Sequence, residues 1–358
     1  MLYYFIFTLI AIFAFIEQFG SVSKKDIRQF FYLFIGVLFC LSFLKWERGS
    51  DWESYYSIFY NGEQFAGDDV TEKGFLFFNK LIRLFTDSYT VYLFFQGAFY
   101  YSIYVILIKK INDVLDENTN KTCYFPILLY DFSIGFAGIF ASRGKIAYLL
   151  CLFSVLYIYK GQLVRFLITI IIASTIHTTS LLFLLAYPLF RSKYTKWTVI
   201  LFVIGVISLF MLGPSLEPFM NAYNYTRYSS YVESNESLSI VNFLKWGVVL
   251  LLAILLKYKK DPLLYWGCLK LYLTGFIIYI WCQMFAHFAQ RIAGVYMSVI
   301  IFWIAMLFYK YNKNSRIIIF FVLVLYSAVS LYGLLNSEYR NLFIPFKFVW
   351  DSFSVDVF

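Results

Sequence analysis

The chain has 358 residues, of which 61% are hydrophobic, 23% are aromatic and only 14% are charged. A soluble globular domain carries about a quarter charged residues, so this composition excludes a water-soluble fold. Apolar runs of about twenty residues recur along the whole length and predict an all-α integral membrane protein, with a single multi-pass domain over residues 1–358. The formal net charge of +9 then indicates basic cytoplasmic loops rather than nucleic-acid binding.

The apolar runs predict about twelve transmembrane or re-entrant helices. In chain order they cover residues 2–19, 30–44, 91–108, 123–140, 145–159, 163–176, 181–190, 197–212, 240–256, 263–282, 292–308 and 317–335. The run at 181–190 is too short to cross a bilayer unless it bends together with the preceding run. Two polar stretches, 45–90 and 213–239, are predicted loops. The first contains an amphipathic segment at 74–85 that we expect to lie in the membrane interface.

Lysines and arginines set the expected orientation. Six alternate loops are rich in lysine and arginine, including SVSKKDIRQ after the first run, and these are predicted to face the cytoplasm. The alternation places both termini and both long loops on the outer, periplasmic face. The inner loops contain no glycine-rich phosphate cradle and no nucleotide motif. Any chemistry is therefore expected outside, on a substrate that carries its own driving force.

Arginines and a histidine from distant parts of the chain share this predicted outer face. They are Arg48, Arg143, His177, Arg227 and Arg291, and Asp51 is close to Arg48 in the sequence. Guanidinium groups present planar forks of donors that suit phosphate oxygens, so their convergence favours a lipid-linked diphosphate as the ligand. His177 can act as a general base, because the pKa of a free imidazole lies near neutrality. Arg143 can take the charge that develops on a leaving diphosphate.

Each of these residues also has a structural interpretation. Arginines at helix ends commonly extend to lipid headgroups. His177 can simply bond a carbonyl at a helix end, and Asp51 can pair with Arg48. Asp131 is the one acid deep inside a predicted helix, so we expect it to pair or to face a polar cavity. The tyrosines around Arg227 are typical of an interfacial belt, and a sugar-stacking surface is the alternative.

Four short motifs follow one another along the N-terminal half. They contain Arg48, Asp51 and Tyr55 in RGSDWESYYSIF, Glu72 and Gly74 in EKGFLFFNKLIRLF, Arg143 and Ala147 in FASRGKIAYLLCLF, and His177 and Ser180 in ASTIHTTSLLFLL. Their order and spacing resemble the EpsG family of polysaccharide polymerases, which is akin to the Wzy O-antigen and capsule polymerases. Gly144 departs from the pattern, because glutamine is commoner there. In the C-terminal half the resemblance depends on topology and on Arg291 in QRIAGVY.

The resemblance implies a glycosyltransferase of GT-C-like architecture in the bacterial cytoplasmic (inner) membrane. It would join undecaprenyl-diphosphate-linked oligosaccharide repeat units on the periplasmic face. In this hypothesis His177 and Arg143 are catalytic, with Arg291 assisting at the departing diphosphate. The substrate-binding set is Arg48, Asp51, Tyr55, Glu72, Arg227 and Arg291. The implied partners are the lipid-linked oligosaccharides, the bilayer, and a chain-length regulator and a flippase of the same pathway.

We expect no cofactor and no metal, since two histidines and scattered acids make no ligand cluster. Two other classes stay open. A flippase for the same lipid-linked sugar would show charged residues along the depth of the bundle and internal repeats, whereas here the polar residues crowd on one face. An O-antigen ligase would share the outer histidine and arginines. Ligases tend to carry one large outer loop late in the chain, but here the longest one is early.

Overall fold

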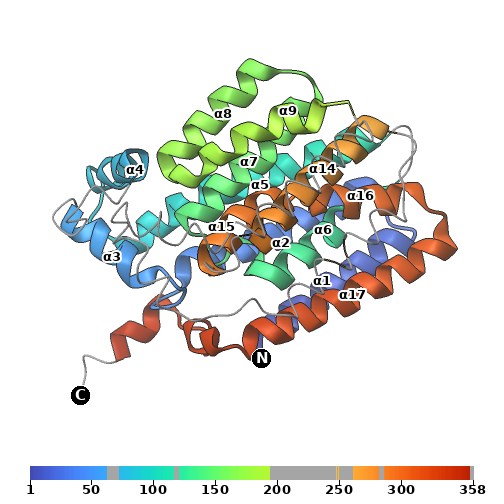
Figure 1. Ribbon diagram of the computed structural model, residues 1–358. Helices are drawn as coiled ribbons and strands as arrows, with labels where there is room; N and C mark the ends of the chain where they lie inside the picture. Colours follow the sequence, from blue (N-terminus) through green and yellow to red (C-terminus); the bar gives the residue numbers. More distant parts are fainter. Residues whose placement is uncertain are drawn as a thin grey trace. The chain divides into compact units, whose positions relative to one another are not determined.

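The computed structural model describes residues 1–62, 72–116, 121–193, 261–281 and 286–354, together with residues 247 and 249. In these ranges every regular element is a helix (Figure 1), and the one isolated β-bridge joins Lys45 to Phe348. The predicted loop 213–239 with Arg227 lies outside the described residues. So do the run 197–212 and most of the run 240–256.

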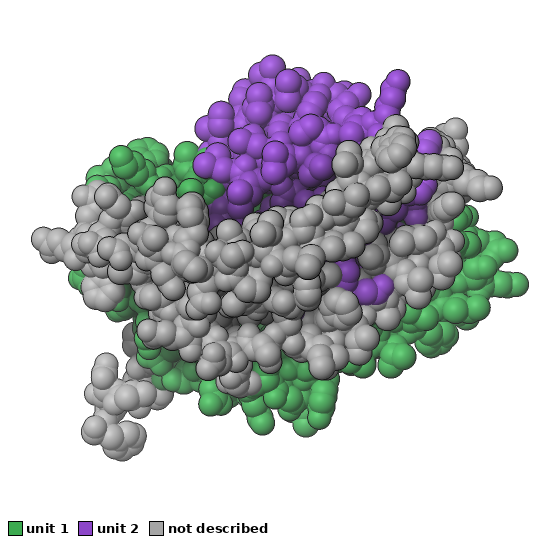
Figure 2. All heavy atoms as spheres, in the orientation of Figure 1, with its two compact units in different colours: residues 1–153, 172–178, 304–358 green, residues 154–171, 179–303 purple. Residues whose placement is uncertain are grey.

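The chain divides into two compact units (Figure 2). Unit 1 comprises Met1–Phe153, Ile172–Thr178 and Ile304–Phe358, and unit 2 comprises Ser154–Ile171 and Thr179–Trp303. The core of unit 1 is built from α1 (Leu2–Phe19), α2 (Lys24–Leu44), α5 (Tyr89–Leu115), α6 (Tyr124–Gly135) and α17 (Lys313–Leu335). Both α1 and α17 pack against α6, and α2 packs against α5.

Five segments of the described chain are long and apolar enough to cross a membrane. They are Leu2–Phe19, Lys24–Leu44, Tyr89–Leu115, Ile292–Lys310 and Lys313–Leu335. Their outward faces are apolar as well: Ile318 and Leu325 on α17 are 66% and 67% exposed. Such faces are stable in hydrocarbon and costly in water. The protein is thus a helical, multi-pass membrane protein, while the count of about twelve helices and the GT-C-like arrangement stay predictions.

Several predicted boundaries differ from the structure because polar residues take part in helices. The helix predicted at 30–44 begins at Lys24, where the Ser23 hydroxyl caps the helix by accepting from the Asp26 N–H at 3.2 Å. The helix predicted at 91–108 extends over Tyr89–Leu115. Hydropathy alone misses these turns, because KKDIRQ and INDVL are too polar to count as apolar runs.

The prediction of one helix over 123–140 is wrong. α6 ends at Gly135, the 3-10 turn η2 covers Phe136–Gly138, and α7 (Arg143–Tyr159) follows. Phe136, Ala137 and Gly138 all have positive φ, which ends the α-helix. Only glycine fits at position 138, since a Cβ there would lie 2.0 Å from the ring of Tyr100 on α5. The tight approach of α5 therefore requires a residue without a side chain at this point of the connection.

The predicted loop 45–90 contains two helices. α3 (Trp52–Asn61) was not predicted, and α4 (Lys73–Arg83) overlaps the predicted amphipathic segment. The two helices pack on each other through a buried cluster that includes Tyr55, Phe59 and Phe75. The opposite face of α4 exposes Phe77. The location of α4 in the membrane interface stays a prediction.

Unit 2 contains α9 (Ala186–Arg191), α14 (Pro262–Trp281) and α15 (Ala286–Met297). Glycines allow the close packing of α14: a Cβ at Gly267 would lie 2.4 Å from the ring of Phe190 on α9, and one at Gly275 would lie 2.7 Å from Cγ of Met297 on α15. Three further elements, α7, α8 (Leu163–Ile176) and α16 (Ile300–Lys310), have residues in both units.

Two predicted runs are divided into shorter helices. The run 181–190 consists of the 3-10 helix η3 (Thr178–Leu185) followed by α9, so it is not one continuous α-helix. The run 292–308 is split between α15 and α16 by a turn at residues 298–299. Even so, Ile292–Lys310 as a whole is long and apolar enough to cross a membrane.

The C-terminal segment of unit 1 braces the loop after α2. It contains the 3-10 helices η6 (Glu338–Leu342) and η7 (Val349–Ser354). The Trp46 N–H donates to the Lys347 carbonyl, and the Gly49 N–H donates to the Leu342 carbonyl, each at 2.9 Å. The loop that carries Arg48 is therefore held by residues almost 300 positions away in the sequence.

Candidate functional site

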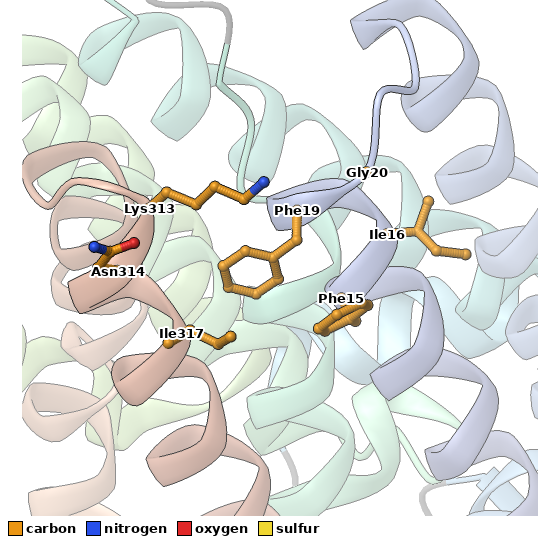
Figure 3. Close-up of a pocket in the computed structure, with 7 residues that line it drawn as sticks. All are labelled: Phe15, Ile16, Phe19, Gly20, Lys313, Asn314 and Ile317. Carbon is orange, nitrogen blue, oxygen red and sulfur yellow. The ribbon is translucent and has the colours of Figure 1, made fainter.

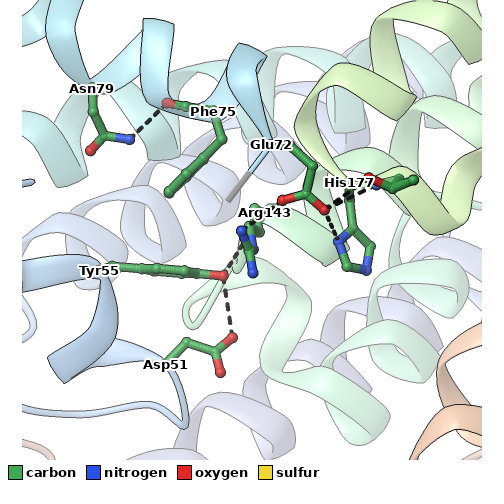
Figure 4. A network of polar contacts seen from close by, with 8 residues as sticks. Asp51, Tyr55, Glu72, Phe75, Asn79, Arg143 and His177 are labelled. Atoms are coloured by element: carbon green, nitrogen blue, oxygen red, sulfur yellow. Dashed lines mark hydrogen bonds and ion pairs between the residues drawn. The ribbon is translucent and has the colours of Figure 1, made fainter. Parts of the chain in front are cut away.

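The carboxylate of Glu72 joins two side chains that lie far away in the sequence (Figure 4). Arg143 donates from Nη1 to Oε2 of Glu72 at 2.6 Å, and His177 Nδ1 lies 3.2 Å from Oε1. The backbone N–H of Thr178 also donates to Oε1, at 3.1 Å. All four residues belong to unit 1. The structure thus brings Arg143 and His177 together on one carboxylate.

Three helix ends supply these side chains. Glu72 is the N-cap residue of α4, Arg143 is the first residue of α7, and His177 directly follows α8. Helix ends leave backbone groups without helical partners, so polar residues are stable there. The backbone N–H of Arg143 donates to the Tyr55 hydroxyl at 3.1 Å, which ties the start of α7 to α3.

Gly74 allows α4 to lie against the end of α8. A Cβ at this position would fall 2.5 Å from Oγ1 and 2.6 Å from the carbonyl oxygen of Thr175. Because Glu72 is two residues before Gly74 and His177 two residues after Thr175, this approach sets the distance between the carboxylate and the imidazole. The glycine two residues after Glu72 in this motif is therefore required for a steric reason, since a side chain there would collide with Thr175.

Glu72 is ionised in this setting. Burial opposes its ionisation, but the hydrogen bond with His177, the charge of Arg143 and the N–H of Thr178 together lower its pKa from 4.5 to about 2. The Glu72 side chain is 10% exposed and that of Arg143 is 21% exposed, so water screens the pair only in part. The carboxylate stays charged at any physiological pH.

The imidazole of His177 is oriented for proton transfer. A carboxylate accepts hydrogen bonds, so its contact with Nδ1 places a ring proton on that nitrogen, and in the neutral ring the lone pair is then on Nε2. The ring packs beside Tyr148, with centroids 5.9 Å apart, and beside Gly144, where a Cβ would lie 3.6 Å from Cδ2. A neutral imidazole held in this way can accept a proton at Nε2.

The guanidinium of Arg143 retains donors for a ligand. Of its five N–H groups, the described residues engage Nη1 through Glu72. Its Cζ atom lies 5.7 Å from the centroid of the Phe75 ring, which covers one face of the plane. The remaining donors can bind phosphate oxygens in the bidentate geometry that arginine favours.

Arg48 and Asp51 lie in the adjoining loop, and they do not pair with each other. Arg48 donates from Nε to the Pro345 carbonyl at 2.5 Å and from Nη1 to the Glu47 carbonyl at 2.9 Å. Asp51 accepts from the Tyr55 hydroxyl at 3.3 Å. The three residues Arg48, Asp51 and Tyr55 line a cavity of about 20 Å³, which is room for one water molecule. Asp51 is thus linked to Arg143 through Tyr55, an arrangement that the sequence did not indicate.

For two further predicted site residues, Arg227 and Arg291, the role stays a prediction. Arg227 lies outside the described residues, and Arg291 lies in α15, where the description does not extend to its side chain. Within the described residues no three histidine, cysteine, aspartate or glutamate side chains gather as metal ligands.

A second hollow in unit 1 lies between α1 and α17 (Figure 3). Its lining is mainly apolar, and it consists of Phe15, Ile16, Phe19, Gly20, Lys313, Asn314 and Ile317. Lys313 is the one ionisable side chain of this lining, and no acid or histidine beside it there could act with it in proton transfer. The hollow is therefore no rival to the Glu72 site as a place for chemistry.

Sequence reasoning named Glu72 through the motif resemblance, but it did not foresee that Glu72 links Arg143 to His177. A glutamate two residues before a glycine, at the start of an amphipathic segment, was the available signal. Its partners are 71 and 105 positions away, and no local pattern reports contacts of that range.

A known protein family matches most of the chain. A model described as the EpsG family matches residues 27–348. The chain belongs to the EpsG family. This is a family of membrane proteins that are like Wzy-type polysaccharide polymerases. No curated protein and no solved structure matches the chain. The matched range of this EpsG-family chain contains every residue of the Glu72 site, so a polymerase-like function is indicated for the part that holds the site.

Proposed function

We propose that this EpsG-family protein is a polysaccharide polymerase of the inner membrane. It would transfer a growing chain from its undecaprenyl diphosphate to the next lipid-linked repeat unit on the periplasmic face. The observation that carries the proposal is the Glu72 carboxylate, which holds a potential base, His177, and a potential anion ligand, Arg143, in one place. Glycosyl transfer from a diphosphate needs both groups.

The proposed reaction is a direct displacement at the anomeric carbon. Nε2 of His177 takes the proton of the acceptor hydroxyl while the hydroxyl oxygen attacks the anomeric carbon. The bond between that carbon and the diphosphate oxygen breaks, and the lipid diphosphate leaves with the electron pair. Glu72 orients the imidazole and stabilises the imidazolium that forms, as a carboxylate does beside a catalytic histidine.

Arg143 serves the leaving group in this proposal. The N–H groups that Glu72 does not engage bind the diphosphate as negative charge develops there. Arg291 assists at the same group, while Arg48, Asp51 and Arg227 position the second lipid-linked substrate. Asp51 suits a sugar hydroxyl better than a phosphate, because it is an acceptor already held by Tyr55.

The decisive experiment is polymer formation by the purified protein from defined undecaprenyl-diphosphate-linked repeat units. We expect Arg143→Ala to abolish chain growth and Arg143→Lys to fail as well, because an ammonium lacks the planar fork. The matched control is Arg83→Lys, since Arg83 is an exposed arginine at the end of α4 that bonds the Tyr60 carbonyl. Full-length polymer from Arg143→Lys would refute the role of Arg143 at the diphosphate.

A deletion strain separates the rival functions. Single repeat units on the cell surface indicate loss of a polymerase. Absence of surface sugar indicates a flippase, and accumulation of free lipid-linked polymer indicates a ligase. Either of the last two phenotypes would contradict the proposed function.

A further inference from the structure

The interruption between α6 and α7, just before Arg143, leaves backbone carbonyl groups without helical partners. Three successive residues with positive φ, Phe136, Ala137 and Gly138, separate α6 from α7. A break of this kind is tolerated at membrane depth only where other groups satisfy the freed carbonyls. The side chains that do so lie on neighbouring elements of unit 1.

Three side-chain donors meet three of these carbonyls. Lys45, at the end of α2, donates from Nζ to the Ile139 carbonyl at 2.7 Å. Lys145, in the first turn of α7, donates to the Gly135 carbonyl at 3.0 Å, and Gln96 on α5 donates to the Ala141 carbonyl at 3.2 Å. Lys45 is 6% exposed and Gln96 is 3% exposed. Burying an ammonium or an amide group is costly unless it is hydrogen-bonded, and the bonds to these carbonyls offset that cost.

The geometry of the break decides where Arg143 lies. Ala141 is two residues before Arg143, and the Ala141 N–H donates to the Gly138 carbonyl at 3.0 Å, so the connection has little slack. Lys45 additionally lies over the Phe140 ring, with Nζ 5.6 Å from the centroid. A shift of the Ile139 or Ala141 carbonyl therefore moves the first turn of α7 and the guanidinium with it.

We propose that Lys45, Lys145 and Gln96 are positioning residues that hold the broken segment so that Arg143 meets the diphosphate of the donor substrate. This inference rests on the proposed function, because it assigns the ligand of Arg143. A misplacement of about 1 Å at a binding group is enough to lower a rate about a hundredfold. The three donors act through Arg143 and do not themselves touch the substrate.

The test is a double-mutant cycle on the affinity for undecaprenyl diphosphate, measured by thermophoresis in detergent. We expect Lys45→Met to weaken binding about tenfold and Arg143→Ala to weaken it at least about tenfold. If Lys45 acts through Arg143, the double variant binds as weakly as Arg143→Ala alone. A structural effect unrelated to Arg143 would instead multiply the two losses, and that result would overturn the proposal.

Controls keep the outcomes distinct. Lys121 also caps carbonyls, those of Tyr309 and Tyr311 at 3.4 and 3.2 Å, but it lies at the start of α6, so Lys121→Met should bind like the wild type. If Lys45→Met does not fold, Gln96→Leu carries the same cycle. Variants that bind like the wild type overturn the positioning role alone. A wild type that does not bind undecaprenyl diphosphate overturns the proposed function as well.

Discussion

Two glutamates of unit 1 use the same functional group in different ways. Glu17 on α1 accepts from the backbone N–H groups of Tyr124 and Phe125, each at 2.8 Å, and so caps the start of α6. Glu72 accepts from one backbone N–H but also binds the side chains of Arg143 and His177. A backbone N–H offers one donor and nothing more, whereas an arginine and a histidine that bind the carboxylate still have further nitrogen atoms to offer a substrate.

The surroundings of the two carboxylates agree with this difference. Near Glu17, further side chains bond the backbone before α6: Gln18 donates to the Thr122 carbonyl at 2.7 Å, and Asn112 accepts from the Cys123 N–H at 2.7 Å. These hydrogen bonds fix the backbone just before the first turn of α6. At the other end of α6 the helix stops at Gly135, and α7 then starts with Arg143 of the Glu72 site. The partners of a buried acid, more than its burial, therefore indicate whether its role is structural or chemical.

The strongest way to sharpen the comparison is Glu72→Gln. The amide is similar in size, but it carries no charge and has one acceptor oxygen for two partners. We expect turnover to fall at least about a hundredfold, since both the base and the anion ligand lose their orientation. Turnover per folded protein is the measurement. A loss of less than about threefold would place Glu72 with Glu17 as a structural residue.

Gly74→Ala tests the same site through the backbone. The added methyl group would collide with Thr175, so α4 must move away from the end of α8 and carry Glu72 from His177. We expect turnover to fall about tenfold or more. Gly36→Ala in α2 is the matched control, because a Cβ there meets nothing within 4 Å. Equal activities for the two variants would contradict the steric reading of the motif.

Glu17→Gln is expected to act on stability and not on chemistry. The amide keeps one acceptor oxygen where the carboxyl group has two, so one of the two backbone N–H groups at the start of α6 loses its partner, at a cost of about 1–3 kcal/mol in the free energy of unfolding. Turnover per folded protein should stay within about twofold of the wild type. Thermal unfolding and the polymerisation assay, carried out on the same sample, measure both. A large loss of turnover in fully folded protein would show that the two glutamates do not differ as argued.

The smallest expected effect is the response of Glu72 to acid. Its pKa in the folded protein, about 2, lies below its ordinary value of 4.5. The stability that its ionisation contributes is therefore fully present above pH 4.5 and is lost as the pH falls toward 2. The difference in melting temperature between the wild type and Glu72→Gln should shrink as the pH falls below about 4.5. A difference that already shrinks near neutral pH would contradict this account.

Much of the fold could be predicted from hydropathy, because the bilayer imposes a length and an apolar surface on each spanning helix. The helices at Leu2–Phe19 and Leu163–Ile176 have the predicted bounds. α3 was missed, since its sequence WESYYSIFYN is too polar to resemble a span and is held in place by packing on α4. The break at Phe136–Gly138 was missed for a related reason: its residues are apolar, and the constraint comes from Tyr100 on another helix.

For the site, the sequence by itself determined the residue types: arginines and one histidine at the ends of apolar runs, beside short motifs that resemble those of a polymerase family. Composition and hydropathy are properties of neighbouring residues, so they could be read directly. Tertiary structure alone decided that Glu72 joins Arg143 to His177, that Asp51 bonds Tyr55 and not Arg48, and that Gly74 must lack a side chain. These facts are distances between segments far apart along the chain, and packing sets such distances.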